Sequence, residues 1–469
     1  MSDILLMYPY VNDITAEVAG MLPPLGLSYI SSYILQFGYK SEIIDCSGQG
    51  IPYSSIPSIV KNKNPKIIGI SSTTPVIHRA IELAYLLKSI NRNILIVLGG
   101  SHVSVLGEEL LEEVNAVDII VKGEGEITFT EILDMHIRQQ IKIEDIKGIS
   151  YRNKEKIVSN PPRPNILNID LIPFPSREVI NYPNYRMPTK WNFKGPFATV
   201  ITSRGCPFLC KFCYVHKMFG RKVRFRSVDN IIKELKVLIQ NFGIKDIIFY
   251  DDTLTLNKER IVNLCNRILI EKINISWGCY SRVDTIDEDI VQIMKKAGCR
   301  MISFGVESGS DEILKRMGKG ITVEDSINAI SICNKHKIET SVSVLVGFPG
   351  ETVKTIIDTK QFLKRLDPLF VSIFRLIPYP GTILFNYYLE QVGKKKLLIS
   401  DFEKINESYI CLKTISNKNI INSLKKMYIV FYMRPKKLKD HLIRTISNAH
   451  LLKGYFRAML WVINQKMKI

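Results

Sequence analysis

The amino-acid sequence predicts an α/β protein with two successive sheet domains and a helical C-terminal region. Residues 1–150 and 196–390 each alternate strand-sized apolar runs with helix-length segments, a pattern typical of parallel sheets. A proline-rich stretch without clean periodicity, residues 151–195, separates them and is expected to form an extended connector. Residues 391–469 have mainly helical spacing, which Pro435 interrupts.

The first domain is predicted to be a doubly wound sheet of the Rossmann or flavodoxin type. We expect a helix over residues 27–37 that ends at Gly38. Ligands of such sheets bind beyond the carboxyl ends of the strands, and the residues there are small or polar, which leaves room for a large ligand. The expected strands cover residues 4–7, 41–44, 66–70, 94–98 and 118–121. The segments at their carboxyl ends are residues 8–9, 71–74, 99–102 and 123–126.

The second domain is predicted to be an open, partial (β/α)6 barrel. Six apolar runs with intervening helical segments carry this expectation, because each run is strand-sized and the spacing between runs fits a helix. The expected strands cover residues 198–202, 244–250, 276–280, 301–306, 339–346 and 371–376.

Composition bounds the class of protein. The 469 residues are 46% hydrophobic, as in a globular protein. The first ten residues lack the basic start and the small-residue cleavage site of a signal peptide. No apolar run reaches the roughly 18–20 residues needed to span a bilayer. We therefore expect a cytoplasmic protein.

The net charge of +19 is concentrated near the C-terminus, where residues 391–469 hold 17 Lys and Arg against 4 Asp and Glu. Such a region can be a solvated surface, or it can bind nucleic acid, an anionic membrane or an acidic substrate. Apolar residues between Leu451 and Ile463 recur near helical spacing among basic ones. Such a helix packs on the barrel or lies on a membrane surface, and the second position would suit a lipid substrate.

Three of the nine cysteines form a cluster, Cys206, Cys210 and Cys213. Thiolates spaced this closely on one loop can hold three corners of a four-iron four-sulfur (4Fe–4S) cluster and leave the fourth iron open. A structural zinc site is the alternative and would need a fourth ligand, for which His216 is near enough. The six scattered cysteines are expected to be core residues. They are Cys46, Cys265, Cys279, Cys299, Cys333 and Cys411.

This cysteine spacing, with Phe212 before the last cysteine, resembles the radical S-adenosylmethionine (SAM) superfamily. The resemblance implies that the open iron chelates SAM and that one electron cleaves SAM to a 5′-deoxyadenosyl radical. Further motifs follow expected barrel strands in family order. The implied SAM-binding residues are Phe212, Asp251, Asp252, Glu307, Ser308, Gly309, Gly347, Pro349 and Gly350. The family's usual glycine pair and glutamate are missing at Asp251 and Asp252.

The N-terminal loops resemble the cobalamin-binding subgroup of radical SAM enzymes, and this likeness covers residues 1 to about 390. The motif Asp-x-His-x-x-Gly, whose histidine binds cobalt in many cobalamin proteins, is missing from the sequence. The alternative is a flavodoxin-like domain without cofactor. The residues that the resemblance implies for cobalamin are Ser72, Thr73, Thr74, Gly99, Gly100, Ser101, His102, Gly123 and Glu124.

The resemblance implies a methyltransferase that acts on an unactivated carbon of a small-molecule or lipid substrate. One SAM would methylate cobalt and a second would supply the radical, with flavodoxin or ferredoxin as electron donor. Relatives with this domain order also close rings or oxidise substrates, so a cyclase is the alternative. Methylthiolation is disfavoured, because its family carries a second cysteine triad upstream and only Cys46 lies there. A nucleic-acid-binding iron–sulfur protein is the alternative from another class.

Overall fold

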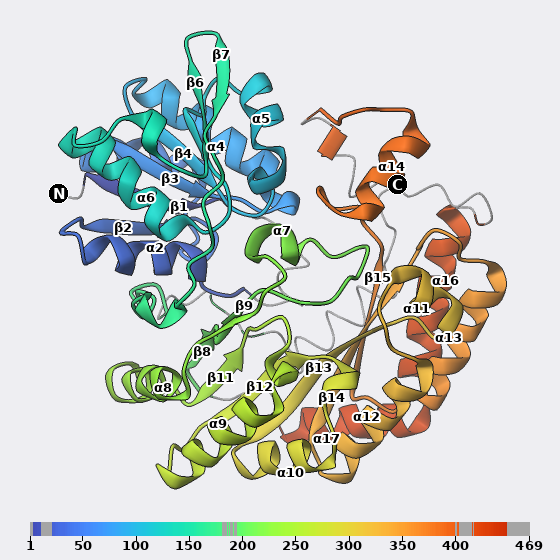
Figure 1. The fold of residues 1–469 in the computed structure, drawn as a ribbon. Helices are drawn as coiled ribbons and strands as arrows, with labels where there is room; N and C mark the ends of the chain where they lie inside the picture. Colours follow the sequence, from blue (N-terminus) through green and yellow to red (C-terminus); the bar gives the residue numbers. More distant parts are fainter. Residues whose placement is uncertain are drawn as a thin grey trace.

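The computed structural model contains two large, mainly parallel sheets, each covered by helices (Figure 1). It describes residues 3–10, 21–180, 185, 187, 191, 195–398, 401–402, 415 and 417–447. The N-terminal domain is drawn in blue to teal and the barrel in green to orange, with α7 (Val215–Phe219) and β9 (Ser203–Arg204) between them.

The N-terminal sheet has the strand order β2-β1-β3-β4-β5-β6-β7. Strands β1 to β5 are parallel, and β6 and β7 add an antiparallel hairpin that carries the sheet past residue 150. The strands are β1 (Ile4–Tyr8), β2 (Ser41–Asp45), β3 (Ile67–Ser71), β4 (Leu95–Gly99), β5 (Ile119–Val121), β6 (Ile149–Asn153) and β7 (Lys156–Ser159). The five predicted strands are therefore confirmed, whereas the sequence analysis missed the hairpin.

Helices cover both faces of this sheet, which confirms the doubly wound prediction. One apolar cluster joins one face to α2 (Leu25–Leu35) and α6 (Gly125–Leu133). Another joins the opposite face to α3 (Ile56–Lys63), α4 (Ile77–Ile90) and α5 (Val103–Glu113). The second cluster continues into α11 (Asp311–Met317) and α14 (Ile383–Val392), so both domains share apolar core.

The barrel sheet has the order β15-β14-β13-β12-β11-β8, and every pair is parallel. All six predicted strands are confirmed. They are β8 (Phe197–Val200), β11 (Asp246–Phe249), β12 (Ser276–Ser281), β13 (Cys299–Glu307), β14 (Glu339–Val346) and β15 (Phe370–Arg375). The covering helices are α8 (Val228–Phe242), α9 (Lys258–Ile270), α10 (Glu288–Lys296), α12 (Val323–Lys335) and α13 (Val353–Arg365).

Both edges of the open barrel are covered by side chains that bond the exposed backbone. At β15, two tyrosines of α16 (Asn417–Tyr432) accept hydrogen bonds from the strand. The Ile373 amide donates to the Tyr428 hydroxyl oxygen at 2.9 Å, and the Val371 amide donates to the Tyr432 hydroxyl oxygen at 3.1 Å. At β8, the connector residue Arg177 donates to the Thr199 carbonyl oxygen at 3.0 Å. An uncovered edge would offer unpaired backbone groups to other chains.

The C-terminal region is helical where it is described. Helix α17 (Pro435–Ser447) follows α16 and begins at Pro435, the predicted interruption, since proline is tolerated at the first position of a helix. Among the helices that the structure describes, none combines the length and apolarity that crossing a bilayer requires. The predicted membrane-surface helix between Leu451 and Ile463, like Cys411, lies outside the described residues.

Trp277 on β12 occupies the centre of the barrel core. Its side chain is fully buried, its indole Nε1 donates to the Ala297 carbonyl oxygen at 2.7 Å, and its ring meets Phe249 edge-on. We expect Trp277→Ala to lower the free energy of unfolding by about 3–5 kcal/mol, because it leaves a large cavity. Leu269→Ala on exposed α9 surface should cost about 0.5 kcal/mol or less. Thermal unfolding of the anaerobic protein measures both, and equal shifts would contradict this account of the core.

Candidate cofactor site at the facing strand ends

The three clustered cysteines lie on a loop that leaves β9 and enters α7. Gly205 begins the loop with φ of +102°, and a Cβ there would come within 2.8 Å of the Lys222 carbonyl oxygen. Only glycine fits both demands. The Cys206 amide donates to the Gly220 carbonyl oxygen at 3.3 Å, which brings the two ends of the loop together.

Each of the three sulfurs faces one hydrogen-bond donor. The backbone amides of Phe208 and Val215 donate to Cys206 and Cys213. The guanidinium Nη1 of Arg282 lies 3.9 Å from the Cys210 sulfur. Donors aimed at sulfur stabilise the thiolate form that ligates iron. The donor set therefore fits an iron–sulfur cluster.

The thiols also influence one another electrostatically. Burial raises the pKa of Cys213 to about 11, and the charges of Cys210, Asp252 and Cys206 add to this effect. Thiolates that repel one another need a cationic metal centre to offset their charge. Among the described residues, no three His, Cys, Asp or Glu side chains converge on a single metal ion, whereas a cubane cluster binds each cysteine to a different iron.

His216, the fourth ligand that a zinc site would need, lies on α7. Burial lowers its pKa, and the charges of Arg221 and Lys217 lower it further.

Arg282 is a site residue that the sequence analysis missed. It follows β12, stacks over the Phe208 ring at 3.6 Å and is buried. Its guanidinium donates to both Asp284 carboxylate oxygens at 2.9 and 2.8 Å and to the Lys319 carbonyl oxygen at 2.7 Å. The signal available in the sequence was its position directly after an expected strand, where the other site motifs also lie.

The two neighbouring aspartates after β11 have different surroundings. Asp251 is buried, and its Oδ1 accepts the Thr202 amide and hydroxyl, both at 3.0 Å, and the Ser203 hydroxyl. Asp252 keeps an exposed side chain, although burial and the charge of Asp251 raise its pKa to about 7. The charge of Asp252 raises the pKa of Cys206 and of Cys213, so this aspartate lies near the cysteines.

Glu307 ends β13 in a strained backbone conformation, with φ of +60° and a break in the register with β14. Its buried carboxylate pairs with Lys319 Nζ at 2.9 Å. Ser308 and Gly309 instead pack against α13, since the Gly309 amide donates to Thr359 Oγ1 at 3.0 Å. Glu307 is therefore the member of this motif that combines a functional group with strain.

The loop after β14 is shaped by its own glutamate. Glu351 accepts the backbone amides of Gly347 and Phe348, and burial raises its pKa to about 7. Gly347 and Gly350 have φ of +107° and +96°, and Pro349 between them is half-buried. Phe212, at the cysteine loop, is half-buried against the apolar cluster that contains Phe348.

Two loops at the carboxyl edge of the N-terminal sheet touch closely. The Ser72 amide donates to the Gly99 carbonyl oxygen at 2.8 Å, and a Cβ on Gly100 would meet the Ser72 carbonyl oxygen at 2.1 Å. His102 is buried beside Thr74, with 3.3 Å between Nδ1 and Oγ1, and it meets the Phe402 ring edge-on. The half-buried Thr73 and Ser101 are the members of these loops that contact site tyrosines.

Gly123 and Glu124 follow β5 but differ in surroundings. Gly123 has φ of +74°, and its amide donates to Ser104 Oγ at 3.0 Å. Glu124 is buried, and its carboxylate pairs with Arg204 and Arg224 from the barrel. The Glu124 carboxylate therefore belongs to an ion-pair network between the domains, and its expected cobalamin contact stays a prediction.

A group of tyrosines connects the two domains. The Tyr8 hydroxyl hydrogen-bonds Thr73, and Tyr250 lies close enough to raise the pKa of Tyr8. Tyr250 keeps 46% of its surface exposed although burial raises its pKa, so it is recessed but accessible. The tyrosine group, named so below, consists of Tyr8, Tyr214, Tyr250, Tyr280 and Tyr379, which are linked by ring contacts or by electrostatic interaction.

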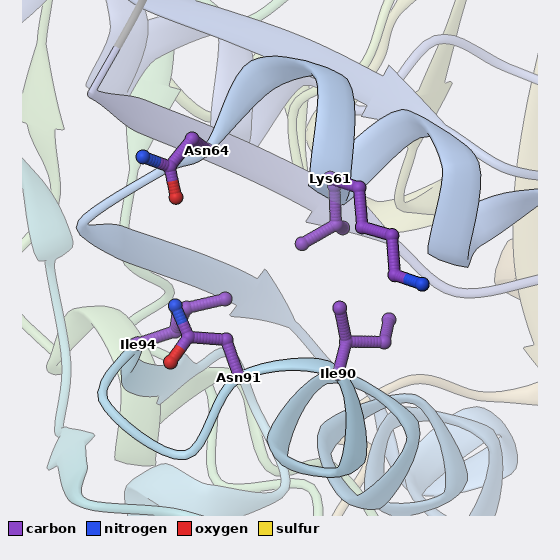
Figure 2. A pocket seen from close by; sticks show the side chains of 6 residues that line it. Lys61, Asn64, Ile90, Asn91 and Ile94 are labelled. Atoms are coloured by element: carbon purple, nitrogen blue, oxygen red, sulfur yellow. The ribbon is translucent and has the colours of Figure 1, made fainter.

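A separate surface pocket lies between the C-terminal ends of α3 and α4 (Figure 2). Figure 2 shows Lys61 and Asn64 across from Ile90, Asn91 and Ile94. None of the site residues described above lines this pocket.

The fold and the cysteine loop define the class of protein as an iron–sulfur enzyme of the radical SAM type. A family model for the radical SAM superfamily matches residues 200–363, and one for the B12-binding domain matches residues 11–133. An uncharacterized methyltransferase of Pyrococcus horikoshii is 37% identical over 98% of this chain and 99% of its own. The chain belongs to the cobalamin-dependent radical SAM family, whose cofactors are a 4Fe–4S cluster, SAM and cobalamin.

Other relatives carry further activities and structures. The anaerobic magnesium-protoporphyrin IX monomethyl ester cyclase of Rubrivivax gelatinosus is 26% identical over 97% of this chain and 82% of its own. The radical SAM methyltransferase TsrM of Kitasatospora setae, solved with cobalamin and a cluster, is 19% identical. Its TM-score is 0.70, with 84% of this chain and 79% of that chain covered. The structure of OxsB with cobalamin bound has a TM-score of 0.74 at 20% identity. The match covers 97% of this chain and 72% of that chain. These likenesses confirm the fold.

The buried His102 predicts a specific pH dependence. Burial lowers its pKa from the ordinary value of 6.5 to about 4. Between pH 6.5 and 4, His102 is protonated in the unfolded chain but stays neutral in the folded chain. The free energy of unfolding therefore decreases as the pH falls from 6.5. The pH dependence of wild-type stability should exceed that of His102→Gln by a slope that rises from about 0.7 kcal/mol per pH unit at pH 6.5 toward about 1.4 near pH 5. Unfolding curves from pH 6.5 to 5 measure this, and parallel pH profiles would contradict the buried neutral state.

Proposed function

We propose that the protein is a methyltransferase that acts on an unactivated carbon of a small-molecule substrate. The likeness over nearly the whole chain to the Pyrococcus relative named as a methyltransferase supports methyl transfer, and the observation that supports adjoining cofactor sites is the hydrogen bond between Tyr214 and Ser101. Tyr214 directly follows Cys213 of the expected cluster, and Ser101 belongs to the expected cobalamin loops. This bond therefore joins the two predicted cofactor regions. When bound, SAM and the cluster supply a radical and cobalamin supplies a transferable methyl group.

The residues of the chain would orient the reactants and limit water. Cys206, Cys210 and Cys213 would hold the cluster, with Arg282 supporting the Cys210 sulfur. Asp252 and Glu307 are the acidic groups that we assign to SAM. Asp252 carries an exposed carboxylate beside the cysteines, and Glu307 carries a buried carboxylate on a strained backbone. The tyrosine group would flank the substrate with rigid aromatic surface and hydroxyl groups, which favours a fixed reacting geometry.

Two further parts of the proposal concern partners. The cluster requires a one-electron donor, for which a flavodoxin or ferredoxin is suitable. The basic C-terminal region could bring the enzyme to a lipid substrate, a role that stays a prediction.

A cyclase without net methyl transfer is the second candidate, because the Rubrivivax relative with that activity aligns with nearly the whole chain. The products distinguish the two functions. Methyl transfer forms S-adenosylhomocysteine and adds one methyl group to the substrate, whereas cyclisation does neither.

We expect anaerobically purified protein from cobalamin-supplied cells to contain about four irons per chain. Each chain should also hold one corrin and form 5′-deoxyadenosine with SAM and dithionite. Replacing Cys206, Cys210 and Cys213 together with Ala should abolish the iron and the deoxyadenosine, because the ligands are removed. Cys265→Ala is the matched control, because this cysteine is fully buried in the barrel core. Deoxyadenosine from the triple variant would refute the cluster assignment, and iron without corrin would favour ring-forming or oxidative chemistry over methyl transfer.

A further inference from the structure

The base of the cysteine loop is closed by two arginines that face each other. Arg204 on β9 and Arg224 on β10 (Arg224–Phe225) are directly opposite in an antiparallel pair, and residues 205–223 form the loop between them. Both side chains are buried, at 7% and 5% exposure. Like charges directly opposite on neighbouring strands repel, so this pairing needs an anion to be stable.

The anions come from the N-terminal domain. Glu124 contacts both arginines, with Oε1 at 2.8 Å from Arg204 Nη1 and Oε2 at 2.8 Å from Arg224 Nη1. Glu126, in the first turn of α6, pairs with Arg204 Nη2 at 2.5 Å. The two glutamates are buried, at 6% and 4% exposure. We call these four residues the inter-domain charge cluster: two positive and two negative groups that balance one another away from water.

The inter-domain charge cluster also contacts the C-terminal part of the cysteine loop. Arg224 donates to the carbonyl oxygens of Phe219, at 3.1 Å, and of the connector residue Ile166, at 2.7 Å. Phe219 ends α7, the helix that begins after Cys213 and Tyr214. Because buried charges tolerate little displacement of their partners, both ends of the loop are fixed to the N-terminal domain.

We propose that Glu124 and Glu126 are positioning residues that fix the cysteine loop relative to the cobalamin-binding domain. Glu124 bridges the two arginines and closes the loop base, while Glu126 shares the charge of Arg204. The distance between the cysteines and the N-terminal strand ends is then set by ion pairs and not by the loop itself. The proposal rests on the proposed function only in that this distance is the one between the two cofactors.

Amide hydrogen exchange on the anaerobic full-length protein tests the positioning. In Glu124→Gln, exchange in residues 205–223 should accelerate about tenfold or more, because the arginines repel without the bridge. Glu126→Gln should accelerate it less, since the bridge remains. Glu131→Gln is the matched control on the same helix, because Glu131 pairs with Arg163 of the connector. It should leave the loop unchanged.

Unchanged loop exchange in folded Glu124→Gln would overturn the proposal. Where that variant fails to fold, Glu126→Gln decides: acceleration confined to the loop supports the proposal, and none overturns it. A second experiment measures the two cofactors directly. It records how strongly the reduced iron–sulfur cluster enhances the relaxation of the electron-spin signal of Co(II) in cobalamin. The enhancement should differ from wild type in Glu124→Gln at full iron and corrin content, and an identical enhancement would overturn the proposal. Wild-type protein without corrin would refute the proposed function, while the exchange measurement still tests the positioning.

Discussion

The site depends on one constraint, namely that parallel strands bring all their carboxyl ends to one edge of a sheet. In both domains the loops with functional groups therefore gather at that edge. Thr73 and Ser101 follow strands of one sheet, and Asp252 and Arg282 follow strands of the other. Tyr8 at the end of β1 lies close enough to Tyr250 after β11 for the two to interact electrostatically, and Tyr214 beside the cysteines hydrogen-bonds Ser101 of the N-terminal domain. A residue from one sheet can thereby act on a group that the other sheet holds.

Buried charge makes this approach specific. An apolar interface alone would tolerate sliding, because the hydrophobic effect is not directional. The carboxylates of Glu124 and Glu126 together compensate the charges of Arg204 and Arg224, and a displaced interface would leave a buried charge without its partner. A second buried group, Glu234 between Arg177 and Arg226, ties the connector to the barrel in the same way. The shared apolar core then adds stability to an orientation that the ion pairs define.

The sequence predicted all eleven strands of the two parallel series, because buried strands are continuous apolar runs and their helices have regular spacing. It missed the β6–β7 hairpin, since those short strands carry polar and charged residues such as Arg152 and Lys156. The three cysteines predicted as metal ligands lie together on one loop, although their ligand role stays a prediction, and five scattered cysteines are buried as expected. The arginine partners of Glu124 and the contact of Arg282 with Cys210 could not be predicted from the sequence, because these residues lie far apart along the chain and only the fold brings them together.

The burial of His102 has a consequence for the cofactor. A histidine that ligates cobalt needs a free ring nitrogen that reaches the metal. His102 is 2% exposed and is held between Thr74 and Phe402. Burial keeps this ring neutral at physiological pH, and the ring packs against Phe402 at the start of α5. The missing Asp-x-His-x-x-Gly motif and this burial both argue against a histidine ligand to cobalt from His102. We therefore expect that His102 does not ligate the cobalt of the cobalamin that these loops are predicted to hold.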